Sequence, residues 1–241
     1  MNLPSELDIN YLIDDLRNFS WEAYDILRFY SNQFRNKKAN KGLIKIKNNN
    51  ELVTQADLKV NDLIIKRISK KYGHIKWNLL SEENGIIKFN NKNIDTNWLW
   101  VLDPLDGTKD FLQKTSNYAV HLALNYKNEP QLGIVLIPEK EELWITNNKT
   151  VWCENRAGFK TKTKLSDRRE IHNMKLVTSK NHKNKILNNI IKKVGFKETI
   201  NMEDMAEVIW ATKYLGDYNI TKYGKNLVLE NQGYQLQLKR I

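Results

Sequence analysis

Trp98-Leu-Trp-Val-Leu-Asp-Pro-Leu-Asp-Gly-Thr-Lys-Asp110 is the stretch of sequence that decides the fold. Its first five residues form an apolar run of strand length, so we expect a buried β-strand there. We expect the strand to end at Asp103-Pro104, because proline cannot donate to a central ladder. Gly107 and Thr108 then mark a loop-to-helix junction, with the Thr108 side chain as the cap of the next helix.

Outward from this stretch, the apolar pattern predicts further helices and strands. Helical spacing occurs over 9–31, after Thr54-Gln-Ala-Asp57, over 186–194 and over 203–215. Short apolar runs predict strands at 77–80, 98–102, 118–126, 131–137, 143–146, 151–153 and 175–178. The polar or basic stretches 36–50, 84–97 and 155–170 are expected to be loops, and 218–241 is strand-like at best. This mixture predicts α+β layers with mostly antiparallel strands.

Composition excludes several classes of protein. The chain has 241 residues and is 41% hydrophobic, which is too apolar for a disordered chain. Cys153 is the only cysteine, so neither a disulfide framework nor a Cys-rich zinc site can form. No apolar run is long enough to span a bilayer, and the first residues do not resemble a signal peptide. We therefore expect a cytoplasmic protein with no membrane partner.

The formal net charge of +11 is unevenly distributed. Residues 1–150 carry 21 basic and 19 acidic residues, whereas residues 151–241 carry 18 and 9. A basic half attracts anionic ligands. However, Lys outnumbers Arg 31 to 8 and Asn is equally abundant at 31, a composition that AT-rich codons supply. Because no RNA- or DNA-binding motif is present, we expect no nucleic-acid partner.

The carboxylates around residue 105 allow two interpretations. Asp103, the Leu105 carbonyl and Asp106 can point at one divalent cation, since Mg²⁺ prefers carboxylate, carbonyl and water oxygens. Gly107 lets the backbone approach a phosphate, and a helix start at Thr108 favours an anion. Alternatively, Asp-Pro and Asp-Gly are ordinary turn pairs that need no metal.

Two other acidic motifs are equally ambiguous when each stands alone. Ser81-Glu-Glu83 follows a short apolar strand that can hold a carboxylate rigidly, but paired glutamates are also ordinary solvated residues. Thr54-x-x-Asp57 has the spacing of a capping box, with Asp in place of the usual Glu or Gln, and can serve as a cap alone.

Taken together and in this order, Val53-Thr-x-Ala-Asp57, Ser81-Glu-Glu83 and Trp100-Val-Leu-Asp-Pro-Leu-Asp-Gly-Thr108 resemble the inositol monophosphatase superfamily. The extension Lys109-Asp-Phe111 is most similar to the 3′(2′),5′-bisphosphate nucleotidase branch of that superfamily. The resemblance covers most of residues 1–194. It implies a layered α/β/α/β/α sandwich, with an N-terminal α+β subdomain over 1–155 and a C-terminal α/β subdomain over 156–241.

The resemblance also implies roles for individual residues. Metal ligands would be Glu82, Asp103, the Leu105 carbonyl, Asp106 and Asp204. Asp57 and Thr108 would activate the attacking water. Substrate contacts would come from Glu82, Leu105, Asp106, Gly107, Thr108 and Asp204. The cofactor would be two or three Mg²⁺ ions, with inhibition by Li⁺, and the substrate would be a small nucleotide bisphosphate.

The second half departs from the family pattern. Residues 195–202 run almost directly into Glu203-Asp-Met-Ala206, which is similar to a family Trp-Asp motif with Glu203 in place of Trp. The segment that normally precedes this motif is missing, so a shortened C-terminal half is expected. Asp204 is either a metal ligand or an acidic residue that favours the helix dipole.

Three functions follow from this reading. The first is a Mg²⁺-dependent phosphatase that hydrolyses adenosine 3′,5′-bisphosphate, in the context of sulfur metabolism. The second is a phosphatase acting on inositol monophosphate or fructose bisphosphate. The third is a degenerate member that binds metal or nucleotide with little or no turnover.

Overall fold

The computed structural model describes residues 3–4, 7–35, 44–46, 52–89, 97–127, 129–147, 150–162, 170–179, 185–202, 219–223, 226–231 and 234–238. The chain forms two compact units, Met1–Lys162 and Thr163–Ile241. The subdomain boundary at 155 stays a prediction. Within the described residues, no helix is long and apolar enough to cross a membrane.

The first unit is built on an eight-stranded sheet with the order β10-β9-β8-β7-β6-β5-β3-β4. Its strands are β3 (Asn78–Ser81), β4 (Gly85–Lys88), β5 (Trp98–Asp106), β6 (Ala119–Tyr126), β7 (Glu129–Ile137), β8 (Glu142–Asn147), β9 (Thr150–Glu154) and β10 (Lys160–Lys162). Every neighbouring pair is antiparallel except β3 and β5, which are parallel. The prediction of mostly antiparallel strands is confirmed for this unit.

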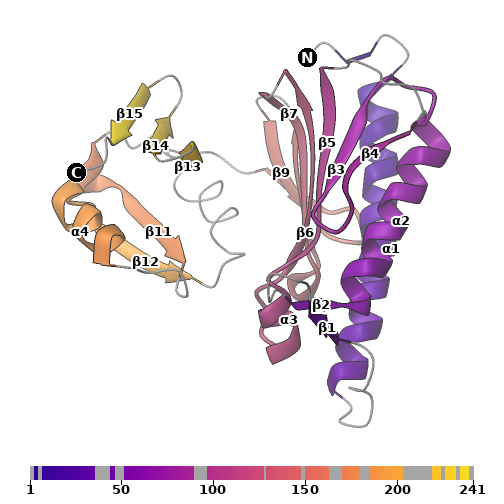
Figure 1. Ribbon diagram of the computed structural model, residues 1–241, viewed down its shortest axis with the longest axis horizontal. Helices are drawn as coiled ribbons and strands as arrows, with labels where there is room; N and C mark the ends of the chain where they lie inside the picture. The colour runs from indigo at the N-terminus through magenta and orange to yellow at the C-terminus, as the bar shows by residue number, and fades with distance from the viewer. Residues whose placement is uncertain are drawn as a thin grey trace. The chain divides into compact units, whose positions relative to one another are not determined.

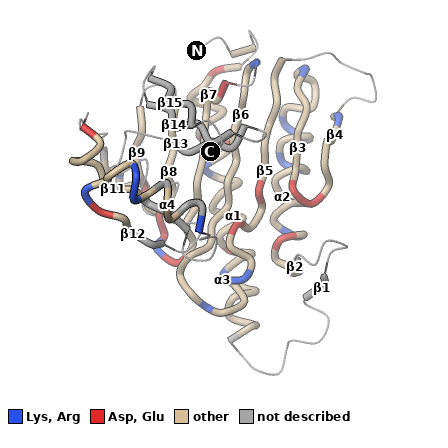
Figure 2. The backbone as a smooth tube through the Cα atoms, turned by 60° about the vertical axis from the view of Figure 1, so that its left-hand side comes forward, with Lys and Arg blue, Asp and Glu red and all other residues tan. Residues whose placement is uncertain are grey.

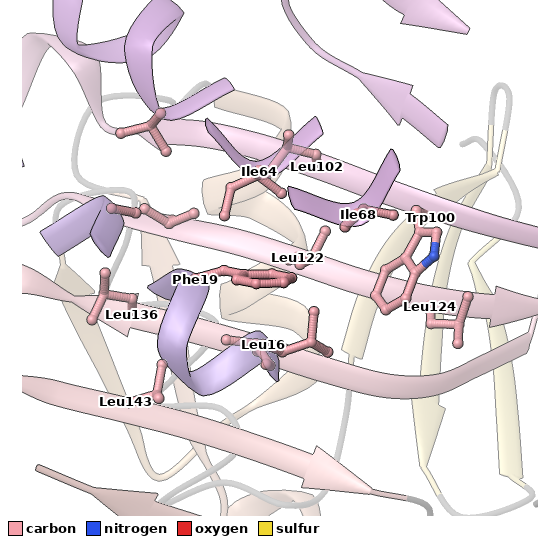
Figure 3. Close-up of a cluster of buried hydrophobic side chains, with 14 of the residues drawn as sticks. Leu16, Phe19, Ile64, Ile68, Trp100, Leu102, Leu122, Leu124, Leu136 and Leu143 are labelled. Carbon is pink, nitrogen blue, oxygen red and sulfur yellow. The ribbon is translucent and has the colours of Figure 1, made fainter. Parts of the chain in front are cut away.

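Two long helices, α1 (Ile9–Arg35) and α2 (Gln55–Tyr72), lie along one face of this sheet (Figure 1). The core lies between the helices and the sheet, because the strands alternate buried and partly exposed residues. Residues from all of these elements meet there: Leu16, Phe19, Ile64, Ile68, Trp100, Leu102, Leu122, Leu124, Leu136 and Leu143 (Figure 3). Short elements complete the unit: β1 (Ile44–Ile46), β2 (Leu52–Thr54), α3 (Thr108–Gln113) and the 3₁₀ turn η1 (Pro138–Lys140).

A partly buried ion pair ties α1 to β9, next to one edge of the sheet. The Arg17 guanidinium donates to Glu154, whose side chain is fully buried at the end of β9. Trp152 donates its indole N–H to the same carboxylate, over 3.1 Å. Glu154 holds the pKa of Arg17 above its ordinary value, mainly through their hydrogen bond.

Strand β5 differs from its prediction in a way that matters for the site. It does not end at Asp103-Pro104 but continues to Asp106. Asp103 pairs with His121 and Asp106 pairs with Ala119, so β5 has one more residue than β6 over this interval, which is a β-bulge. The bulge accommodates Pro104, because residues at a bulge need not donate to the ladder.

Other differences from the predicted elements are smaller. The first helix continues to Arg35, and β1, β4 and β10 lie within stretches expected to be loops. Gly107 is the N-cap of α3 with φ 80° and no side-chain cap hydrogen bond, so the prediction that Thr108 caps this helix is wrong. A left-handed backbone at that position favours glycine.

The second unit is described by itself. Strands β11 (Lys175–Ser179) and β12 (Glu198–Met202) pair in parallel, and the chain between them contains α4 (Lys185–Val194). A 3₁₀ turn, η2 (Ile171–Asn173), precedes β11. Strands β13 (Asn219–Tyr223), β14 (Asn226–Asn231) and β15 (Tyr234–Leu238) form an antiparallel three-stranded sheet. The helix predicted over 203–215, and with it Asp204, lies outside the described residues.

Candidate active site

The adjacent ends of β3 and β5 bring Glu82 and Asp103 together. These strands are parallel, with Ser81 opposite Leu102, and the Glu82 amide donates to the Leu102 carbonyl over 3.1 Å. Glu82 follows Ser81 and Asp103 follows Leu102, so the two carboxylates come next to each other at these strand ends. The Asp103 side chain is hydrogen-bonded to the Glu82 side chain. Burial, together with the nearby charges of Glu82 and Asp106, raises the pKa of Asp103 well above its usual range.

The bulge in β5 positions the third carboxylate. Beyond it, Leu105 is almost fully buried and its amide donates to Asp103 Oδ1 over 3.1 Å. Asp106 follows at the end of the strand, close enough for its charge to act on Asp103. A bulge re-aims side chains at the rim of a sheet, which explains how two carboxylates three residues apart reach one region.

Asp57 is buried at the start of α2, where it connects this helix to the turn after β5. Thr54 and Asp57 form a reciprocal capping box, and the Thr54 amide donates to Asp57 Oδ2 over 2.8 Å. The other oxygen, Oδ1, accepts from the Thr108 hydroxyl over 3.1 Å. The Thr108 hydroxyl is also 3.1 Å from the Leu105 carbonyl. The capping interpretation of Thr54-x-x-Asp57 is thus confirmed, and the same aspartate also contacts Thr108.

Burial dominates the protonation of Asp57. Desolvation raises its pKa to about 6, while the hydrogen bonds from Thr54 act in the opposite direction. A carboxyl group with such a pKa can accept a proton close to neutral pH, which is the range where a general base works best.

His121 on β6 is a residue that the sequence reasoning missed. It pairs with Asp103 across the two strands, and its Nε2 lies 3.7 Å from Asp106 Oδ2. Burial lowers the pKa of His121 to about 4, so the ring is neutral at pH 7 and this approach is no salt bridge. The sequence alone could not single out His121, because the register between the two predicted strands decides which β6 side chain lies beside Asp103.

The donor chemistry of this region fits a hard divalent cation. The part of the chain that the structure describes holds no group of three or more His, Cys, Asp or Glu side chains already arranged to hold a metal ion. Burial, and after it repulsion from the negative charges of Glu82 and Asp106, raises the pKa of Asp103. A bound cation relieves such repulsion, and carboxylate and carbonyl oxygens are the ligands that Mg²⁺ takes.

The predicted site residues of the first unit are therefore close together in space. Acidic residues mark the turn after β3, the end of β5 and the start of α2 (Figure 2). Gly107 and Thr108 begin α3 directly after Asp106. For Asp204 the predicted role stays a prediction.

Comparison with known proteins identifies the family. The sequence profile of the inositol monophosphatase family matches residues 12–210. The chain therefore belongs to the inositol monophosphatase family. It is 31% identical over 153 residues to a 3′(2′),5′-bisphosphate nucleotidase CysQ of Buchnera aphidicola, covering 63% of this chain and 54% of that protein. It is 32% identical over 103 residues to an inositol-1-monophosphatase of Mesorhizobium japonicum, covering 43% and 36%.

The chain thus spans about half the length of the first relative and about a third of the second. Among solved structures, the extragenic suppressor protein suhB of Bartonella henselae superposes with a TM-score of 0.67 at 20% identity. That match covers 88% of this chain and 80% of the other. It shows the fold, which is the layered α/β sandwich expected from the sequence.

Proposed function

We propose that this protein is a Mg²⁺-dependent, lithium-sensitive phosphatase that hydrolyses adenosine 3′,5′-bisphosphate to AMP and phosphate. The observation that carries the proposal is the hydrogen bond from Thr108 to the buried Asp57, next to the carboxylates at the ends of β3 and β5. Nucleotide specificity is supported by Lys109-Asp-Phe111 after the shared motif and by the likeness to the CysQ nucleotidase.

The contacts of the described side chains support a role for each of them. Glu82, Asp103, Asp106 and the Leu105 carbonyl would hold the cation. For Asp204, which lies outside the described residues, the metal role is a proposal from the family resemblance alone. When bound, Mg²⁺ lowers the pKa of water and offsets the negative charge that develops on the phosphate. The Thr108 hydroxyl donates to Asp57 and so presents its lone pairs to the attacking water.

The reaction needs no covalent intermediate. The water oxygen attacks phosphorus, the bond from phosphorus to the 3′ oxygen breaks, and the leaving 3′ oxygen takes up a proton from solvent water. Asp57 accepts the water proton by way of Thr108, which its pKa of about 6 suits. The Gly107 and Thr108 backbone amides orient the phosphate.

A second candidate substrate is inositol monophosphate, because the inositol-1-monophosphatase of Mesorhizobium japonicum also matches this chain. Phosphate release from adenosine 3′,5′-bisphosphate, inositol 1-phosphate and fructose 1,6-bisphosphate, each with Mg²⁺ and with or without Li⁺, separates the candidates. We expect the fastest release from the nucleotide and suppression by Li⁺.

Asp106→Asn tests the site itself. We expect this variant to keep its fold and to lose activity by a factor on the order of 10²–10³, because one charged group of the site becomes neutral. Asp62→Asn is the matched control, since Asp62 is exposed on α2. Full activity in the Asp106 variant would refute the metal assignment. Folded wild-type protein that releases no phosphate from any substrate would favour the degenerate binding protein instead.

A further inference from the structure

His121 offers a nitrogen atom as a metal ligand in a region where the other candidate ligand atoms are oxygens. The register of β5 and β6 places it opposite Asp103, at the residue where the β5 bulge begins. Its side chain and that of Asp106 are 24% and 32% exposed. The pairing of β5 with β6 fixes the backbone at both residues, and each side chain keeps only partial exposure.

The distance between the two side chains has a specific chemical meaning. At 3.7 Å, His121 Nε2 and Asp106 Oδ2 are too far apart for a hydrogen bond. Two ligand atoms that each lie about 2.1 Å from one ion are separated by roughly 3.0 Å in a cis arrangement and by roughly 4.2 Å in a trans arrangement. The observed separation falls within this range, so one cation can contact both atoms with little movement of the backbone.

We propose that His121 is a further metal ligand, which binds the same cation as Asp106 and makes this a mixed nitrogen and oxygen site. The inference rests on the proposed function, because it requires that these carboxylates hold a cation. Imidazole binds Co²⁺ and Zn²⁺ far better than Mg²⁺, whereas carboxylates and carbonyls suit Mg²⁺. His121 therefore gives the site a high affinity for borderline transition-metal ions in addition to Mg²⁺.

The test is calorimetric titration of the full-length protein with Co²⁺ and, separately, with Mg²⁺. In His121→Ala we expect the Kd for Co²⁺ to rise about tenfold or more. The Kd for Mg²⁺ should change by less than about threefold, since water replaces imidazole on Mg²⁺ at little cost. The visible absorption band of bound Co²⁺ should shift as well, because a nitrogen ligand is lost.

Two further variants make the result specific. His121→Asn keeps a polar side chain of similar shape, so it guards against misfolding, and it should lose Co²⁺ affinity as the alanine variant does. His74→Ala removes an exposed histidine after α2 and should bind both ions like the wild type.

The outcomes separate this inference from the proposed function. Equal losses for Co²⁺ and Mg²⁺ in both His121 variants would show that His121 only supports the structure, and would overturn the inference. Unchanged Co²⁺ affinity would overturn it as well while leaving the Mg²⁺ site intact. A wild-type protein that binds neither ion would instead overturn the proposed metal site, and the inference with it.

Discussion

Asp57 is a buried carboxylate whose two oxygens serve different partners. One oxygen accepts from Thr54 and fixes the start of α2, and the other accepts from Thr108. Burial keeps the charged form unfavourable, as its pKa of about 6 shows. The residue therefore costs stability at neutral pH so that a proton acceptor can be held beside the carboxylates, which is typical of a functional site.

The substitution Asp57→Asn should show how much folding stability the buried charge of Asp57 costs. The folded pKa of about 6 exceeds the ordinary 3.8, so the folded state binds the proton more tightly. The free energy of unfolding contributed by Asp57 should then fall as pH rises from about 4 to about 6, by about 3 kcal/mol. An asparagine has no charge to lose, and its amide can donate to Thr108 while Thr108 donates to the Leu105 carbonyl.

We therefore expect the metal-free Asp57→Asn protein to be more stable than metal-free wild type at pH 7 and equally stable near pH 4. In assays with Mg²⁺, we expect the variant to be inactive. Urea denaturation at several pH values in the presence of a chelator measures this difference. If the two proteins showed the same pH dependence, the carboxyl group would have to be ionised without cost in the folded protein.

The start of α2 is the element that couples helix formation to the site. The Thr54 hydroxyl accepts from the backbone amides of Ala56 and Asp57, while the Asp57 side chain accepts from Thr54. A reciprocal box of this kind satisfies two amides that a helix otherwise leaves without partners. The same contacts hold the Asp57 carboxylate in one orientation.

Thr54→Ala should therefore lower both stability and turnover. Loss of an N-cap hydroxyl costs about 1–2 kcal/mol, and kcat should fall with little change in KM because Asp57 loses an orienting partner. Thr54→Ser retains the hydroxyl and should restore both properties. Urea midpoints and steady-state phosphate release measure the two effects. A stability loss without a change in kcat would show that Thr54 acts as a cap alone.

Some helices and strands could be predicted from the sequence, and others could not. Helices α1 and α2 and the central strands were predictable, because their apolar residues recur at the spacing of buried faces. The continuation of β5 was not, because Pro104 signals the end of a strand unless a bulge removes the need for its amide. The edge strands β4, which is Gly-Ile-Ile-Lys, and β10, which is Lys-Thr-Lys, are too short to show a pattern of their own, so pairing with a neighbouring strand defines them.

Part of the candidate site could also be predicted from the sequence, and part could not. Motif order was sufficient to propose that Glu82, Asp103 and Asp106 act together, and the parallel pairing of β3 with β5 explains their proximity. The contact of His121 with this group depends on the register between β5 and β6, which an isolated motif does not specify.

At the scale of the whole molecule, the positive net charge suits the anionic substrate proposed above. The net charge is +11, and residues 151–241 carry twice as many basic as acidic residues. Summed positive charge raises the local concentration of an anionic ligand and speeds its encounter with the protein. This effect grows with the charge of the ligand, so a substrate with two phosphates should benefit more than one with a single phosphate.

Ionic strength should therefore affect kcat/KM in a substrate-dependent way. Raising it from about 0.01 M to about 0.15 M shortens the Debye length from about 30 Å to about 8 Å. Over this range we expect kcat/KM for adenosine 3′,5′-bisphosphate to fall about three- to tenfold, and that for inositol 1-phosphate to fall less. Steady-state assays at saturating Mg²⁺ give both slopes, and sucrose of equal osmolality should leave them unchanged. Equal slopes for the two substrates would mean that salt acts on the metal ion or the fold rather than on encounter with the substrate.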